Sequence, residues 1–195
     1  MKNFQILIVL LLPLSVLGQT GIIKFQPLPL ASSVPTISLG YEHVISEKGT
    51  LQLNIDYASE SFMGFKSTWT GLGVEYRIYN LIPSLNTDNG GAPSGLFIAP
   101  TVGIRFFKDV DTEDKDPEFE EKYSFGNAGA LIGYQWIPTL KNGKKLIALE
   151  ASVGLLGGFM LKGDSFDYED YAVWPRFNIG FIPTANIGIG VAFGK

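Results

Sequence analysis

The last ten residues of this 195-residue chain alternate two kinds of side chain, and this pattern constrains the fold more than any other feature. One parity carries large apolar residues, namely Ile187, Ile189, Val191 and Phe193. The other parity carries asparagine, glycine and alanine instead of charged residues. Alternation with a period of two predicts a β-strand. Small residues on the second face predict that this face packs in a crowded space and not against water.

The same alternation recurs along the chain, and no stretch shows convincing helical periodicity. The predicted strands are 21–31, 36–45, 49–58, 68–79, 95–107, 126–136, 145–156 and 173–193. Two prolines in the first segment favour an edge strand, a bulge or a kink there. The last segment keeps one parity throughout, which predicts one long strand with an irregularity at Pro183, or alternatively a hairpin at 183–185. Eight strands are expected, with ten as the alternative.

The segments between the predicted strands form two alternating sets. The first set holds most of the acidic residues and comprises 32–33, 59–67, 109–122 and 162–170. The second set comprises 46–49, 81–94 and 139–145. Bacterial membrane barrels have an even strand count, long outer loops and short periplasmic turns. We therefore expect the first set outside and both ends of the mature chain in the periplasm, although 81–94 is long for a periplasmic turn.

Composition excludes several classes of function. The net charge of −4 offers no basic patch for nucleic acid. Charged residues make up 17% of the chain, against roughly 25% in soluble domains. The chain has no cysteine, so disulfides, thiolate nucleophiles and cysteine-ligated metals are excluded.

The N-terminus has the pattern of a secretory signal. Lys2 supplies a positive start, residues 4–17 are almost all apolar, and Val16 and Gly18 suit a signal-peptidase site. The apolar run is short for a membrane-spanning helix, and an N-terminal anchor is the alternative. No cysteine follows the run, which excludes a lipoprotein anchor. We expect a signal peptide over 1–18 and a single barrel domain over 19–195, without a transmembrane helix.

Charged residues on the small-residue parity nearly balance in sign. The acids are Glu42, Asp56, Glu75 and Glu150, and the bases are Arg77, Arg105 and Arg176, with Lys24 as a further candidate. Buried charges need partners, and bidentate arginine–carboxylate pairs suit a tight interior. An eight-stranded barrel has room only for side chains, which explains glycine and alanine on the same face. We therefore predict that these residues form a structural charge network in the lumen.

The opposite parity is essentially uncharged across the middle of each strand, as contact with lipid requires. A strand crosses the membrane in about 9–11 residues. Aromatic residues near strand ends predict an interfacial girdle, consisting of Tyr41, Tyr57, Tyr76, Phe106, Tyr134, Trp136 and Phe193. The sequence thus predicts an all-β fold, an eight-stranded antiparallel up-and-down transmembrane β-barrel.

Four segments, 22–57, 71–79, 94–107 and 128–136, resemble a family of small outer-membrane β-barrel proteins found in Bacteroidota. That family is mostly of unknown function and is similar in architecture to the barrel of outer-membrane protein A. The resemblance covers nearly the whole mature chain and implies a location in the cell outer membrane. It also implies recognition by the barrel-assembly machinery through Phe193, although Gly194 and Lys195 follow this aromatic residue and depart from the usual signal.

Catalytic residues, metals and cofactors are not expected. The single histidine, His43, lies on the lipid-facing parity, whereas Glu42 points to the other face, so their adjacency builds no dyad. The acidic segment 109–122 lacks the glycine and terminal glutamate of an EF-hand and is expected to be solvated, with weak binding of Ca²⁺ or Mg²⁺ left open. The glycine-rich stretches do not match a phosphate-binding loop.

The expected function is a non-enzymatic outer-membrane barrel with a structural or surface-recognition role through its outer loops. Its expected partners are outer-membrane lipids and the assembly machinery, and no specific ligand is predicted. Two alternatives stay open, a lipid-modifying enzyme in the same membrane and a soluble secreted barrel that binds an apolar ligand.

Overall fold

A computed structural model describes residues 21–29, 36–62, 64–79, 81–82, 93–111, 120–138, 147–162 and 180–193. These residues form a closed antiparallel barrel in the order β1-β2-β3-β4-β5-β6-β7-β8. The strands are β1 (Gly21–Pro29), β2 (Thr36–Ser46), β3 (Gly49–Phe62), β4 (Phe65–Tyr79), β5 (Gly95–Asp111), β6 (Glu120–Trp136), β7 (Ile147–Lys162) and β8 (Gly180–Phe193). The predicted eight-stranded all-β up-and-down barrel is confirmed. The expected signal peptide over 1–18 lies outside the described residues.

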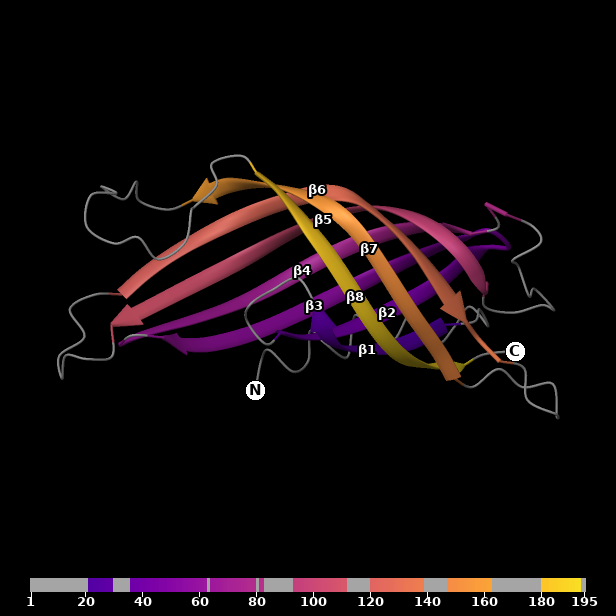
Figure 1. Cartoon of the computed structure of the whole chain (residues 1–195), viewed down its shortest axis with the longest axis horizontal. Coiled ribbons are helices and arrows are strands. Elements are labelled where there is room, and N and C mark those ends of the chain that lie inside the picture. The colour runs from indigo at the N-terminus through magenta and orange to yellow at the C-terminus, as the bar shows by residue number, and fades with distance from the viewer. Residues whose placement is uncertain are drawn as a thin grey trace, which may run out of the picture.

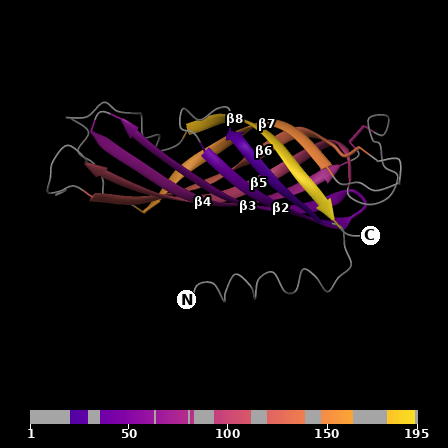
Figure 2. The same ribbon diagram turned by 90° about the horizontal axis from the view of Figure 1, so that it is seen from below.

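The barrel closes where its first and last strands meet. Gly21 of β1 pairs with Phe193 of β8, so these two strand ends lie at the same end of the barrel, together with the turn at 47–48. We call this end proximal and the opposite end distal. The strands run obliquely to the long axis of the barrel (Figures 1 and 2). Among the described residues, no helix has the length and apolarity needed to cross a membrane.

Strands at the distal end run further than the sequence pattern predicts. β3 and β4 stay paired up to Phe62 and Phe65, and Gly64 takes a φ of 78° in the connection. The predicted loop at 59–67 is therefore wrong. The ladder there carries serine, threonine and lysine, and such a strand outside an apolar environment shows no apolar alternation. The ends of the predicted loop 109–122 likewise belong to β5 and β6.

The sequence predicts an irregularity in the first strand and another in the last strand, at Pro183. β1 changes register against β8 between Phe25 and Leu28, which confirms the predicted irregularity in this proline-containing strand. β8 pairs with β7 without a shift, and Pro183 lies opposite Leu155. The alternative of a hairpin at 183–185 is therefore wrong, and the irregularity predicted at Pro183 is absent from this pairing. Residues 173–179 of the predicted last strand lie outside the described part of the chain.

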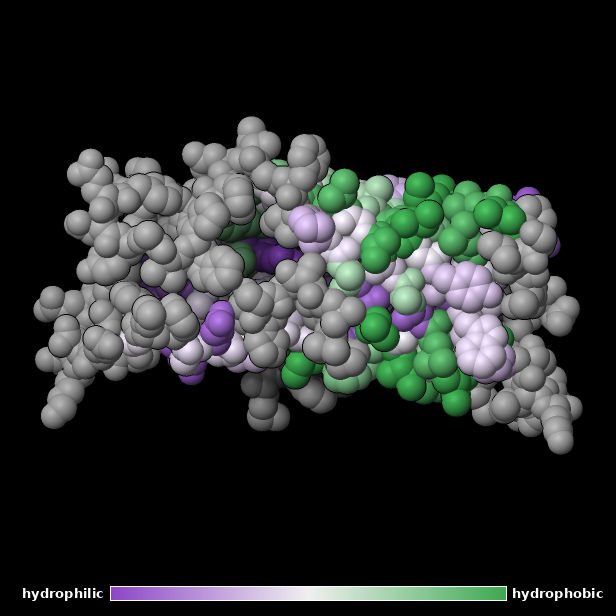
Figure 3. All heavy atoms as spheres, in the orientation of Figure 1, coloured by the Kyte–Doolittle hydropathy of each residue, from purple (hydrophilic) through white to green (hydrophobic). Residues whose placement is uncertain are grey.

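The polarity of the barrel is inverted relative to a soluble protein. Outward-facing apolar side chains are exposed, with values of 55% for Leu39, 56% for Ile23 and 60% for Val191. Such side chains gather on the barrel wall toward the end at which Figure 1 marks the C-terminus, as the space-filling view in the same orientation shows (Figure 3). Polar side chains, including Lys24 and Arg77, are buried inside. A small apolar cluster of Ile22, Ile137, Ala148 and Ala192 fills the lumen at the proximal end.

Crowding in the lumen explains the glycines of the last strand. A Cβ atom added to Gly190 would lie 2.9 Å from Ile22 Cγ2, 2.9 Å from the Ile23 carbonyl oxygen and 3.0 Å from Lys24 Cγ. A Cβ atom on Gly188 would lie 3.1 Å from Gln26 Cγ. The small face of β8 therefore packs against side chains that β1 sends into the lumen.

Candidate functional site

Arg77 is the centre of a buried charge network in the proximal half of the lumen. Its side chain comes from β4 and is fully buried. Arg77 Nη1 and Nη2 donate to Glu150 Oε2 and Oε1 of β7 at 2.6 and 2.8 Å, which makes a bidentate pair. Arg77 Nε and Nη2 also donate to Glu75 Oε2 at 3.0 and 2.7 Å. The guanidinium lies 4.6 Å from the centroid of the Phe97 ring.

Lys24 joins the other side of the network from β1. Its Nζ donates to Glu150 Oε2 and to Gln135 Oε1, both at 2.5 Å, and forms an ion pair with Glu42 of β2. Glu42 Oε1 also accepts hydrogen bonds from Thr50 Oγ1 at 2.6 Å and from the Tyr79 hydroxyl at 2.9 Å. Two cations and three carboxylates thus share one buried interior.

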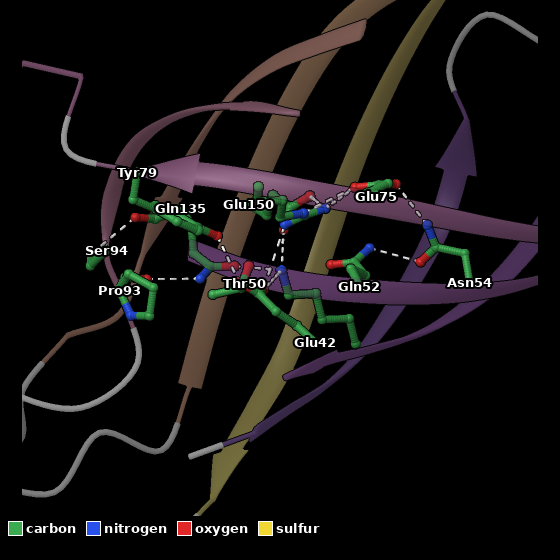
Figure 4. A network of polar contacts seen from close by, with 12 residues as sticks. Glu42, Thr50, Gln52, Asn54, Glu75, Tyr79, Pro93, Ser94, Gln135 and Glu150 are labelled. Carbon is green, nitrogen blue, oxygen red and sulfur yellow. Dashed lines mark hydrogen bonds and ion pairs between the residues drawn. The ribbon is translucent and has the colours of Figure 1, made fainter. Parts of the chain in front are cut away.

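Neutral side chains extend the network toward both ends of the barrel. Gln52 Nε2 donates to Asn54 Oδ1 at 2.7 Å, and Asn54 Nδ2 donates to Glu75 Oε1 at 2.6 Å. On the proximal side, Gln135 Nε2 donates to the carbonyl oxygen of Pro93 at 2.9 Å (Figure 4). The network therefore ties strands on opposite sides of the barrel to the segment that leads into β5.

This arrangement fills the proximal lumen with paired charges. A buried ion without a partner is costly, whereas a fully hydrogen-bonded network can make the interior rigid. The charged members lie next to the apolar cluster of Ile22, Ile137, Ala148 and Ala192, since Lys24 and Ile22 are neighbours on the inner face of β1. The packed interior offers structural support to the wall and no room for solute at this level.

The structure divides the predicted network into two groups. Lys24, Glu42, Glu75, Arg77 and Glu150 come together as described. Asp56 and Arg105 lie nearer the distal end, on the two strands that flank Gly71 of β4. A Cβ atom on Gly71 would lie 3.2 Å from Asp56 Oδ2 and 3.3 Å from Arg105 Cγ, so both side chains reach over this glycine. The Arg105 guanidinium lies 4.7 Å from the centroid of the Trp69 ring. Arg176 lies outside the described residues.

A cavity of about 70 Å³ lies between the charge network and the distal end. Its lining includes Asp56, Trp69, Arg105, Asn127 and Asn186. A polar cavity of this size has room for several water molecules. Its small volume matches the limited interior expected of eight strands.

An inward-facing aromatic cluster lies toward the distal end and was not anticipated from the sequence. Phe107 stacks on Tyr123 with ring centroids 4.9 Å apart, and Phe125 meets both rings edge-on at 5.7 Å. Trp69 contacts Phe107 at 6.0 Å. The signal was present, because Phe107 shares the parity of the inward-facing Arg105. It was missed because the alternation was followed only to the end of the apolar pattern.

His43 lies on the outer face at the proximal end, as its parity predicts. Its Nδ1 is 3.4 Å from the Tyr41 hydroxyl, and the Tyr41 ring stacks on Phe193 at 6.2 Å. Glu42 points into the lumen instead and is fully buried. The described residues contain no group of three histidines or acids that could hold a metal ion.

Comparison with known proteins gives one similar fold. No protein-family model matches the chain, and no curated protein matches it. The N-terminal β-barrel domain of Pseudomonas aeruginosa OprF is similar in structure, with a TM-score of 0.47 and 15% sequence identity over 89% of this chain and 96% of that chain. At this level the likeness says nothing about function, and the barrel assignment rests on the strand pairing itself.

Proposed function

We propose that this chain is a non-enzymatic β-barrel of the bacterial outer membrane, with a structural role in the envelope and a surface-recognition role through its distal loops. The inverted polarity carries this proposal. Apolar side chains cover the outer wall, while charged side chains pair inside the lumen. A soluble barrel requires the reverse, because a continuous apolar exterior of this extent would promote association in water.

The outer wall has the dimensions of a membrane-spanning surface. On β5, residues 96–106 carry no charged side chain on the outward parity, a length within the roughly 9–11 residues that a tilted strand needs. The outward residues there are Leu96, Ile98, Pro100, Val102, Ile104 and Phe106. Tyr76, Tyr134, Trp136 and Phe193 are exposed toward the proximal ends of their strands, as an aromatic girdle requires.

A structural role follows from the filled lumen. The charge network pairs β1 and β2 with β4 and β7 through buried side chains, so it supports the circular shape of the wall. A solute-conducting role is not supported, because Arg77 and Glu42 are fully buried where a channel would pass. Recognition is assigned to the distal end, where the acidic segment around 112–119 joins β5 to β6.

Export and assembly complete the proposal. The apolar run before Gln19 would direct the chain to the periplasm, where the assembly machinery would recognise the outward-facing Phe193 at the end of β8. A lipid-modifying reaction gains no support from His43, because its side chain contacts Tyr41 on the outer face while Glu42 points into the lumen.

Heat-modifiable migration of the full chain, expressed in a bacterial host with its own leader, tests the proposal. A closed membrane barrel should fractionate with the outer membrane, require detergent for solubility, and run at different positions before and after boiling. A chain that is soluble in plain buffer and shows no shift on boiling would contradict it and would favour a soluble barrel with an apolar ligand.

A further inference from the structure

Lysine side chains gather on the outer face of the wall at the distal end. On the outer face of β4, β5 and β6 lie Lys66, Lys108 and Lys122, which we call the lysine patch. Lys108 and Lys122 have side chains that are 48% and 71% exposed. The neighbouring acids Asp109 and Glu121 take the opposite parity and face the lumen side.

The lysines are held close together in spite of their like charge. Lys108 lies directly opposite Lys122 in the β5–β6 ladder. Like charges in such a cross-strand position destabilise a sheet. Glu120 offsets this repulsion, because its Oε2 lies 2.9 Å from Lys108 Nζ and its Oε1 pairs with Lys122 Nζ. With Lys66 on the adjacent strand, the three lysines and one glutamate leave a net charge of +2.

The patch lies directly beyond the apolar part of the wall. Phe106 and Ser124 form the pair two residues closer to the proximal end, and Phe106 is exposed on the outer face. Two residues of a strand span about 7 Å. When the apolar wall occupies the hydrocarbon core, the lysine patch therefore reaches the level of the lipid headgroups in the distal leaflet.

We propose that the lysine patch binds the phosphate group of an anionic membrane lipid in the distal leaflet. The inference rests on the proposed membrane location. Lysine ammonium groups are strong donors to phosphate oxygens, and several of them beside a membrane surface act together. Glu120 competes with the phosphate for the same two ammonium groups, so its carboxylate sets the affinity.

The Glu120 carboxyl group must be ionised in order to compete with the lipid phosphate for the two lysines. Hydrogen bonds from Lys122 and Lys108 lower the pKa of Glu120 to about 2. The carboxylate is therefore ionised at neutral pH and remains a competitor of the lipid phosphate throughout the physiological range.

Native mass spectrometry of the full chain in neutral detergent, titrated with phosphatidic acid or phosphatidylcholine, tests the proposal. Each lysine beside an anionic surface contributes about fivefold in affinity, so the double variant K108Q/K122Q should bind phosphatidic acid about twenty-five-fold more weakly. E120Q should bind it about fivefold more tightly, because the competitor is removed. The control K48Q changes an exposed lysine in the proximal turn and should bind as the wild type does.

The affinity for phosphatidic acid should fall in K108Q/K122Q and rise in E120Q. These opposite changes distinguish a phosphate site from a general loss of structure, which would weaken binding in both variants. Equal binding by the wild type and K108Q/K122Q, weaker binding by E120Q, or equal affinity for phosphatidylcholine would overturn the proposal. All variants are first checked for the heat-modifiable band. Absence of that band in the wild type would reject the membrane barrel itself, whereas its presence without a preference for phosphatidic acid would reject only the lysine patch.

Discussion

Replacement of Arg77 by methionine should destabilise the barrel more than any other single change in the lumen. Methionine fills much of the space but removes all four hydrogen bonds that the guanidinium makes to Glu75 and Glu150, at 2.6–3.0 Å. The network then holds one cation, Lys24, against three buried carboxylates. Removal of one partner from a buried ion pair costs about 3–5 kcal/mol, and we expect R77M to lie at the upper end of this range.

Glu150→Gln provides the matched comparison. It keeps the shape of the side chain and leaves two cations against two carboxylates, so the charges balance. Only the hydrogen bonds between Glu150 and the two cations are weakened, and we expect a loss of about 1.5–3 kcal/mol. R77K keeps the charge but loses the bidentate geometry and should fall between these two variants.

Urea unfolding in lipid vesicles, followed by the heat-modifiable band, measures these differences. The order of stability should be wild type, E150Q, R77K and then R77M. If R77M were as stable as E150Q, the balance of buried charge would not govern stability here. If both variants unfolded at the wild-type midpoint, the network would have no structural role.

The remaining predictions address the crowded lumen, the distal rim and the outer wall. Gly190→Val should lower the free energy of unfolding by about 1–3 kcal/mol, because its side chain would overlap Ile22 and Lys24. The control Gly157→Ala should unfold at the wild-type urea midpoint, because its Cβ atom would lie 3.6 Å from the nearest atom. The Glu120 carboxyl should titrate near its pKa of about 2. Its ion pairs therefore support the folded state above pH 4.5 and are lost as the pH falls toward 2. A titration midpoint near 4.5, measured by NMR of this carboxyl group, would contradict the assigned contacts. Leu39→Arg on the outer wall should cost about 2–4 kcal/mol in vesicles, whereas Ser61→Arg beyond the apolar wall should be tolerated, and equal unfolding midpoints would argue against contact with lipid.

The strands at the distal end show where reasoning from sequence stopped short. Hydrophobic alternation detects a strand only where one face meets an apolar environment. Residues 59–61 pair with 66–68 in a ladder of polar side chains that ends at the Phe62–Phe65 pair, so their periodicity carried no signal. The inward aromatic cluster around Phe107 was overlooked for the same reason.

The lumen charges show a different limit. Their parity placed Glu42, Glu75, Arg77 and Glu150 on the inner face, and the structure locates all four there. Parity says nothing about height along the barrel axis, because height depends on the stagger between strands. Asp56 and Arg105 share the inner face but lie at another level, beside Gly71 and apart from the network.

The sequence by itself determined which side chains face in and which face out, because a strand turns successive residues to opposite sides. It also determined the narrow lumen, since glycine and alanine leave room only for the side chains of neighbouring strands. Only the tertiary structure decided which charges meet. Arg77 and Glu150 are 73 positions apart, and Lys24 and Glu150 are 126 apart. Closure of β1 on β8 and the tilt of the strands bring these groups to one level, and no local pattern encodes that level.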